Sequence, residues 1–134
     1  MGLDMYLKRR KKGGNNNDES SQDVGYWRKA NHIHQWFVEN CQDGIDECQV
    51  TVITKADLED LLATCDAVMA MKEECLNGGK TPGELLPTQS GFFFGGTEYD
   101  EYYFDDVQDT INIIEAVLAE TNFDESEITY QSSW

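Results

Sequence analysis

Alternating apolar and polar positions near the start of the chain predict a β-strand over residues 2–8, with one apolar face. The segment CQVTVI at 48–53 is rich in β-branched residues and predicts a second, short strand. A third strand is expected over 89–95, where glycines bracket three phenylalanines, and a fourth over 127–134. We expect the first and the last of these strands to be neighbours in one sheet.

Three segments carry apolar residues three and four positions apart, which is typical of amphipathic helices: 27–41, 55–74 and 104–121. Thr54 precedes the second of them and Asp57 follows three residues later, a variant of the capping box. The order of elements predicts an α+β domain. We expect a small, mostly antiparallel sheet of about four strands, packed on one face by three helices.

The whole chain, residues 1–134, is expected to form this single α+β domain, because its length suits one hydrophobic core. Residues 9–23 contain no large apolar residue, so we expect a mobile polar loop there. No apolar stretch is long enough for a transmembrane helix, and the first residues do not resemble a signal peptide. The four cysteines form no CxxC pair, so we expect free thiols and no metal site.

Charge is distributed unevenly along the chain, with 10 basic and 26 acidic residues and a net charge of −16. This balance argues against general nucleic-acid binding and against docking on an anionic membrane. Seven of the ten basic residues lie within residues 1–30. A site for an anionic ligand would therefore use the N-terminal third of the chain.

The segment GYWRKANHIH at 25–34 combines aromatic, cationic, amide and imidazole side chains at the expected start of a helix. Helical spacing would place Trp27, Asn31 and His34 on one face. We expect Trp27 to stack on a planar ligand, Arg28 and Lys29 to meet its phosphates, and Asn31 and His34 to read its polar edges.

A second segment, 85–104, has seven aromatic residues interleaved with amides, hydroxyls and carboxylates. Such a mixture offers π-faces for stacking and polar groups for the edges of a planar ligand. The expected ligand-binding residues here are Gln89, Ser90, Tyr99, Asp100, Tyr102 and Tyr103. Our central expectation is that this segment and 25–34 meet in space and enclose a ligand-sized hollow.

No HExxH, GxSxG or phosphate-binding loop motif is present, so no catalytic residue and no cofactor is expected. A protein that binds a small planar, phosphorylated ligand without converting it fits this pattern best. One alternative is a nucleotide phosphodiesterase or related hydrolase that uses His34 with Glu98 or Asp100. Another is an acidic protein-interaction module that occupies a basic host protein.

Four blocks of the chain are distinctive: MGLDMYL at 1–7, GYWRKANHIHQWFV at 25–38, LLPTQSGFFFGGTEYDEYYF at 85–104 and YQSSW at 130–134. In these blocks the chain resembles a family of small proteins encoded by bacteriophages and prophages. Proteins of this family are sometimes labelled phosphoglycerate kinase. A chain of 134 residues without a nucleotide loop is too short for that two-domain enzyme.

The resemblance implies a protein in the cytoplasm of an infected bacterium. Several unrelated phage proteins capture nucleotide signals of bacterial immunity, so by analogy we expect sequestration of a cyclic or ADP-ribose-type nucleotide. A sheet covered on only one face would also leave a surface for a second copy, so a homodimer is a further expectation.

Overall fold

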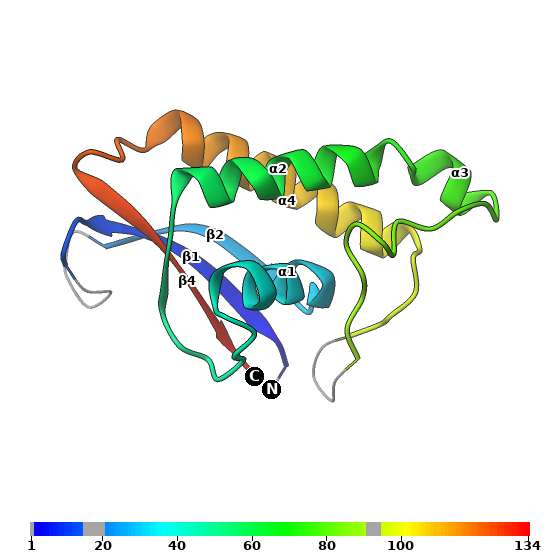
Figure 1. The fold of residues 1–134 in the computed structure, drawn as a ribbon, viewed down its shortest axis with the longest axis horizontal. Coiled ribbons are helices and arrows are strands. Elements are labelled where there is room, and N and C mark those ends of the chain that lie inside the picture. Colours follow the sequence, from blue (N-terminus) through cyan, green and yellow to red (C-terminus); the bar gives the residue numbers. More distant parts are fainter. Residues whose placement is uncertain (1, 15–20, 91–94) are drawn as a thin grey trace.

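The computed structural model describes residues 2–14, 21–90 and 95–134, which form one antiparallel sheet with helices packed on one face (Figure 1). The strands lie in the order β2-β1-β4-β3, and all neighbouring pairs are antiparallel. The strands are β1 (Asp4–Lys11), β2 (Gln22–Arg28), β3 (Thr51–Ile53) and β4 (Ser126–Ser133). The expected α+β class with a four-stranded antiparallel sheet is confirmed.

The first and last strands are paired at the centre of the sheet, as the sequence predicted. Asp4 lies opposite Ser133 and Leu7 lies opposite Tyr130, so the two described ends of the chain are close together (Figure 1). Leu3, Met5 and Leu7 are fully buried on the face that the helices cover. The period of two in the sequence therefore identified the inner face of β1 correctly.

The outer face of the sheet carries charged pairs. The strands that form this face extend into the expected loop. Arg10 on β1 forms an ion pair with Glu127 on β4 at 2.8 Å, and Lys8 lies 3.7 Å from Asp23. The expected loop at 9–23 is therefore wrong at both ends, because β1 continues to Lys11 and β2 begins at Gln22. Tyr26 and Val52 are exposed beside these charged pairs on the same face, and the homodimer stays a prediction.

The helices are α1 (Asn31–Cys41), α2 (Lys55–Met69), α3 (Lys72–Leu76) and α4 (Glu101–Glu120). Helices α2 and α4 pack against each other and run in opposite directions across the sheet (Figure 1). The capping box at the start of α2 is confirmed: the Asp57 N–H donates to the Thr54 hydroxyl, and the Thr54 N–H donates to the Asp57 carboxylate, both at 3.0 Å. The helix expected over 55–74 is divided in two, and the chain turns between α2 and α3.

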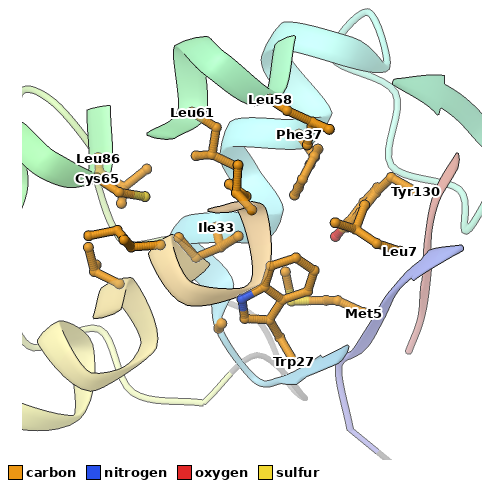
Figure 2. Close-up of a cluster of buried hydrophobic side chains, with 14 of the residues drawn as sticks. Met5, Leu7, Trp27, Ile33, Phe37, Leu58, Leu61, Cys65, Leu86 and Tyr130 are labelled. Carbon is orange, nitrogen blue, oxygen red and sulfur yellow. The ribbon is translucent and has the colours of Figure 1, made fainter. Parts of the chain in front are cut away.

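Side chains from β1, β2, β4, α1, α2 and α4 form one core (Figure 2). Phe37 of α1 stacks on Tyr130 of β4, with ring centroids 4.0 Å apart and 13° between the planes. Gly25 lets α4 approach β2, because a Cβ at this position would lie only 2.7 Å from the Cγ2 of Ile113. This core holds α1 and α4 in fixed positions above the sheet.

The largest correction concerns residues 27–30, where the sequence predicted helix. Trp27 and Arg28 belong to β2, Lys29 adopts a left-handed conformation with φ of 57°, and α1 begins at Asn31. The strand expected over 48–53 is limited to Thr51–Ile53. Of the strand expected over 89–95, positions 91–94 lie outside the described residues, and positions 89, 90 and 95 belong to no strand.

The four cysteines are free thiols, and burial raises the pKa of Cys41 and of Cys65 to about 12. Such thiols are unreactive at neutral pH, because the thiolate is the nucleophilic form. None of the helices in the described ranges has both the length and the apolar character needed to cross a membrane.

Candidate functional site

A pocket of about 380 Å³ lies where the end of β2 and the start of α1 face the segment that leads into α4. Its volume falls at the lower end of the range for small-molecule sites, about 300–1,000 Å³. The lining residues are Arg28, Lys29, Asn31, His32, Gly95, Gly96, Glu98, Asp100, Tyr102, Tyr103 and Asp106. The expectation that the two sequence segments meet and enclose a hollow is confirmed.

Gly95 lies at the closest approach of the two segments. Its φ of 83° is in the left-handed region, and a Cβ would lie 3.0 Å from the Lys29 Cβ and 3.1 Å from the Lys29 carbonyl oxygen. Only glycine combines this backbone conformation with so little space. The position of Gly95 therefore fixes one wall of the pocket against the residue that precedes α1.

Asn31 joins the two segments by hydrogen bonds from both ends of its side-chain amide. Its Nδ2 donates to the Gly96 carbonyl oxygen at 2.7 Å, and its Oδ1 accepts from the Gln89 N–H at 2.8 Å. The side chain is buried. These bonds make Asn31 a clamp for the pocket wall, whereas the sequence predicted that it reads the edges of a ligand.

Arg28 and Lys29 supply positive charge at the pocket. Both are exposed, and neither forms an ion pair or a side-chain hydrogen bond with a described residue. The adjacent start of α1 has no side-chain cap on Ala30 and no acidic residue in its first turn. Two cations without an ionic partner among the described residues, beside an uncapped helix N-terminus, favour an anion at this position. The role predicted from the sequence for Arg28 and Lys29, contact with the phosphates of a ligand, stays a prediction.

Carboxylates from the start of α4 line the other side of the pocket. Asp100 caps α4, since its Oδ1 accepts from the Tyr103 N–H at 3.1 Å. Burial, and then the neighbouring carboxylates led by Asp109, raises the pKa of Asp106 to about 7. Across the described ranges, no group of three or more histidine, cysteine, aspartate or glutamate side chains is arranged to hold a metal ion.

His32 is the main pocket residue that the sequence analysis missed. It is only 3 % exposed, and its ring stacks on Tyr103 with centroids 4.2 Å apart. Its Nε2 has no hydrogen-bond partner among the described residues and lies 4.0 Å from Oδ2 of Asp106. Burial lowers the pKa of His32 to about 4, so the imidazole is neutral at neutral pH.

The three tyrosines expected to wall the ligand occupy different environments. Tyr102 is 79 % exposed and lines the pocket, so its ring is accessible for stacking. Tyr103 also lines the pocket but is buried, and its hydroxyl donates to the Leu86 carbonyl oxygen at 2.6 Å. Tyr99 lies behind Tyr103, with its ring edge-on at 4.9 Å, and is not among the lining residues.

Trp27 and His34 lie in the core, which corrects both predictions. The Trp27 indole is 4 % exposed and donates from Nε1 to the Thr110 hydroxyl at 2.7 Å (Figure 2). The His34 ring is fully buried, with Nδ1 2.6 Å from the Tyr130 hydroxyl and Nε2 2.9 Å from Asp46. Because α1 starts four residues later than expected, Trp27 shares no helix face with His34.

Gln89 and Ser90 do not line the pocket, although both were expected to read polar edges. Their side chains are exposed, and the backbone N–H of Gln89 is used in the bond to Asn31. The sequence analysis also omitted the two pocket glycines, Glu98 and Asp106 from the ligand-binding set. Six of its eleven ligand-binding residues line the pocket: Arg28, Lys29, Asn31, Asp100, Tyr102 and Tyr103.

The resemblance that the four sequence blocks described above carry to small bacteriophage and prophage proteins stays a prediction. Comparison of the chain with protein-family models, with curated proteins and with solved structures gives no match.

Proposed function

We propose that the pocket binds a small phosphorylated ligand, with a nucleotide as the best candidate. The observation that carries this proposal is that Arg28 and Lys29, which have no ionic partner in the described part of the chain, border a concave site beside the uncapped N-terminus of α1. The exposed ring of Tyr102 offers a surface on which a planar base can stack. The phosphate would lie at the cations and the base would lie over this ring.

The net charge of the protein opposes the approach of an anion from a distance, but local contacts decide binding. The chain carries a net charge of −16, yet salt screens exposed charges beyond about 8 Å at physiological ionic strength. Hydrogen bonds from a guanidinium to a phosphate act at contact distance and are among the stronger ones in proteins. The cations at the pocket can therefore hold a phosphate within an acidic protein.

The pocket volume narrows the class of nucleotide. About 380 Å³ suits a ligand the size of one nucleotide, or one end of a larger molecule. Within the phage setting that the sequence resemblance implies, we propose that the protein holds a cyclic or ADP-ribose-type signalling nucleotide and withdraws it from the host. Binding alone would suffice for this role, without a chemical step.

A direct test measures the binding of AMP, cyclic AMP, ADP-ribose and inorganic phosphate by isothermal titration calorimetry at pH 7. The double variant Arg28→Ala/Lys29→Ala should bind the nucleotides at least tenfold more weakly, because a hydrogen bond to a charged group contributes about 1.5–3 kcal/mol. Lys55→Ala/Lys80→Ala is the matched control, since it removes two exposed lysines that do not line the pocket. Equal binding by the two double variants, or no binding of any probe by the wild type, would refute the proposal.

A hydrolase is the second candidate, and one observation favours it. His32 and Asp106 place an imidazole and a carboxyl group 4.0 Å apart at the pocket, and their pKa values are shifted in opposite directions. These residues would replace His34, which lies in the core and cannot reach a ligand in the pocket. Released ligand that is recovered unchanged after incubation with Mg²⁺ or Mn²⁺ and heat denaturation supports binding without catalysis. Conversion that His32→Phe abolishes supports the hydrolase.

A further inference from the structure

We propose that His32 and Asp106 form a hydroxyl-recognition site inside the pocket, so that its ligand is a phosphorylated sugar and not a bare phosphate or a simple phosphate ester. This inference rests on the proposed function and names the second group that the ligand must carry. The phosphate would lie at Arg28 and Lys29, and a sugar hydroxyl would lie between the imidazole and the carboxyl group.

The first observation is the unpartnered ring nitrogen of His32. Its Nε2 is buried and has no hydrogen-bond partner among the described residues, although the residue lines the pocket. Nearly all buried polar atoms in native proteins are hydrogen-bonded, so an orphaned nitrogen beside a cavity indicates a missing partner. The stacked ring of Tyr103 holds the imidazole in place before any ligand arrives.

The second observation is the distance from this nitrogen to Asp106. Nε2 and Oδ2 are 4.0 Å apart, too far for a direct hydrogen bond. One oxygen atom placed between them can lie at about 2.8 Å from both, which is the usual hydrogen-bond distance. A hydroxyl group suits this position because it both donates and accepts, whereas a phosphate oxygen only accepts.

The charges around the pair also favour an uncharged group. Burial opposes the ionisation of Asp106 most, followed by the carboxylates of Asp109, Asp105 and Asp100, so its pKa is raised. His32 lies opposite Asp106 on α1. A neutral imidazole beside a partly protonated carboxyl group binds a hydroxyl without burying a new charge. A phosphate in the same place would meet these carboxylates and be repelled.

The pocket size brings the two contacts within the span of one small molecule. In a sugar phosphate, the hydroxyls lie a few bonds from the phosphorus, and a pocket of about 380 Å³ holds a molecule of that size. Methyl phosphate has the same anionic group without hydroxyls, and ribose has the hydroxyls without the anion. Ribose 5-phosphate combines both groups.

The experiment titrates these probes, with inorganic phosphate, into the wild type and three variants by ligand-observed NMR at pH 7. We expect the wild type to bind ribose 5-phosphate at least tenfold more tightly than methyl phosphate. His32→Phe, which keeps a ring against Tyr103, and Asp106→Asn should reduce this preference about tenfold, because each removes one partner of the hydroxyl, and neither should weaken the binding of methyl phosphate. Glu115→Gln is the matched control, because it removes an exposed carboxylate of α4 that neither lines the pocket nor acts on Asp106, and it should keep the full preference.

A second measurement uses the wild type alone and does not depend on the folding of a variant. The ¹⁵N chemical shift of the His32 Nε2 should move when ribose 5-phosphate is added and stay constant with methyl phosphate. Equal affinities for these two probes in the wild type, or an unchanged preference in His32→Phe, would overturn the inference and leave a bound water as the partner of Nε2. Binding of ribose that depends on His32, with no binding of any phosphate, would instead refute the proposed function and uphold the hydroxyl site. Failure of every probe to bind would refute both.

Discussion

Replacing His32 with phenylalanine separates the packing of its ring from the hydrogen-bonding capacity of its Nε2 atom. The ring packs against Tyr103 in a stacked arrangement, and phenylalanine can keep that contact. The Nε2 atom is buried without a hydrogen-bond partner among the described residues, and phenylalanine removes it. If Nε2 is reserved for a ligand, then the variant should be more stable than the wild type while the pocket loses affinity for a sugar phosphate.

The size of the effect follows from the cost of burying an unsatisfied polar atom, about 1–3 kcal/mol. Phenylalanine is slightly larger than histidine, and overpacking a full core costs about 1 kcal/mol or more, which offsets part of the gain. We therefore expect the free energy of unfolding to rise by about 1 kcal/mol. For a domain of this length, that corresponds to an increase in Tm of about 4 °C.

Urea unfolding at pH 7, followed by circular dichroism, measures the change. His34→Phe is the matched control, because it makes the same substitution on the same helix. The two nitrogens of His34 contact the Tyr130 hydroxyl and Asp46, so this variant leaves a buried hydroxyl unsatisfied and should lose about 2–3 kcal/mol. A loss of 1 kcal/mol or more in His32→Phe would show that Nε2 already has a stabilising partner in the free protein, and the reasoning would fail.

Three further predictions concern pH, the pocket wall and the sheet. Folding lowers the pKa of His32 from 6.5 to about 4, so its contribution to stability is full above pH 6.5 and is lost as the pH falls through about 4. Folding raises the pKa of Asp106 from 3.8 to about 7, so its contribution is full below pH 3.8 and is lost as the pH rises through about 7. In Asp106→Asn the free energy of unfolding should therefore rise more steeply between pH 4 and 7 than in the wild type. If urea unfolding gives parallel plots of stability against pH for the two proteins, the raised pKa of Asp106 is contradicted. Asn31→Ala removes both hydrogen bonds of the clamp, so it should lower the free energy of unfolding by about 1–2 kcal/mol and weaken the binding of ribose 5-phosphate at least tenfold. An unchanged affinity by calorimetry would argue against the clamp. Arg10→Ala should cost about 3 kcal/mol in thermal unfolding because it leaves the half-buried carboxylate of Glu127 unpaired, and a loss below 1 kcal/mol would mean that solvent replaces the arginine.

Local periodicity predicted the elements whose inner faces are continuously apolar. The alternation in β1, the capping box of Thr54 and the spacing of apolar residues by three and four positions in α4 each depend on residues close together in sequence, and all were found. The pairing of the first and last strands was also predicted, although no local pattern specifies it.

The start of α1 was mispredicted because Trp27 fits two periodicities. It lies four residues before Asn31, which suits a helix, and two residues after Gly25, which suits a strand. Tertiary contacts decide between them, since Trp27 pairs with Met5 on β1 and its indole bonds to Thr110. The ends of the 9–23 segment were mispredicted because pairing between strands extends them: the end of β1 pairs with β4, more than a hundred residues away, and Gln22 of β2 pairs with Arg9 of β1.

The approximate location of the pocket was predictable from composition, but its residues were not. Cationic and aromatic residues in two separate segments indicated where a ligand could bind, and the segments do meet. The shift in the start of α1 changed which histidine faces the pocket, so that His34 lies in the core and His32 lies at the ligand side. Asp106 carried no distinguishing signal, since it is one of many acidic residues in this chain.

The pairing of β1 with β4 has a consequence for how the protein is made. Arg10 and its partner Glu127 are 117 positions apart, so the central ladder of the sheet closes only when the last strand has left the ribosome. Until then β1 presents an open edge that can pair with another nascent chain. Synthesis arrested before Ser126 should therefore yield an aggregation-prone chain, even though every helix has already been translated.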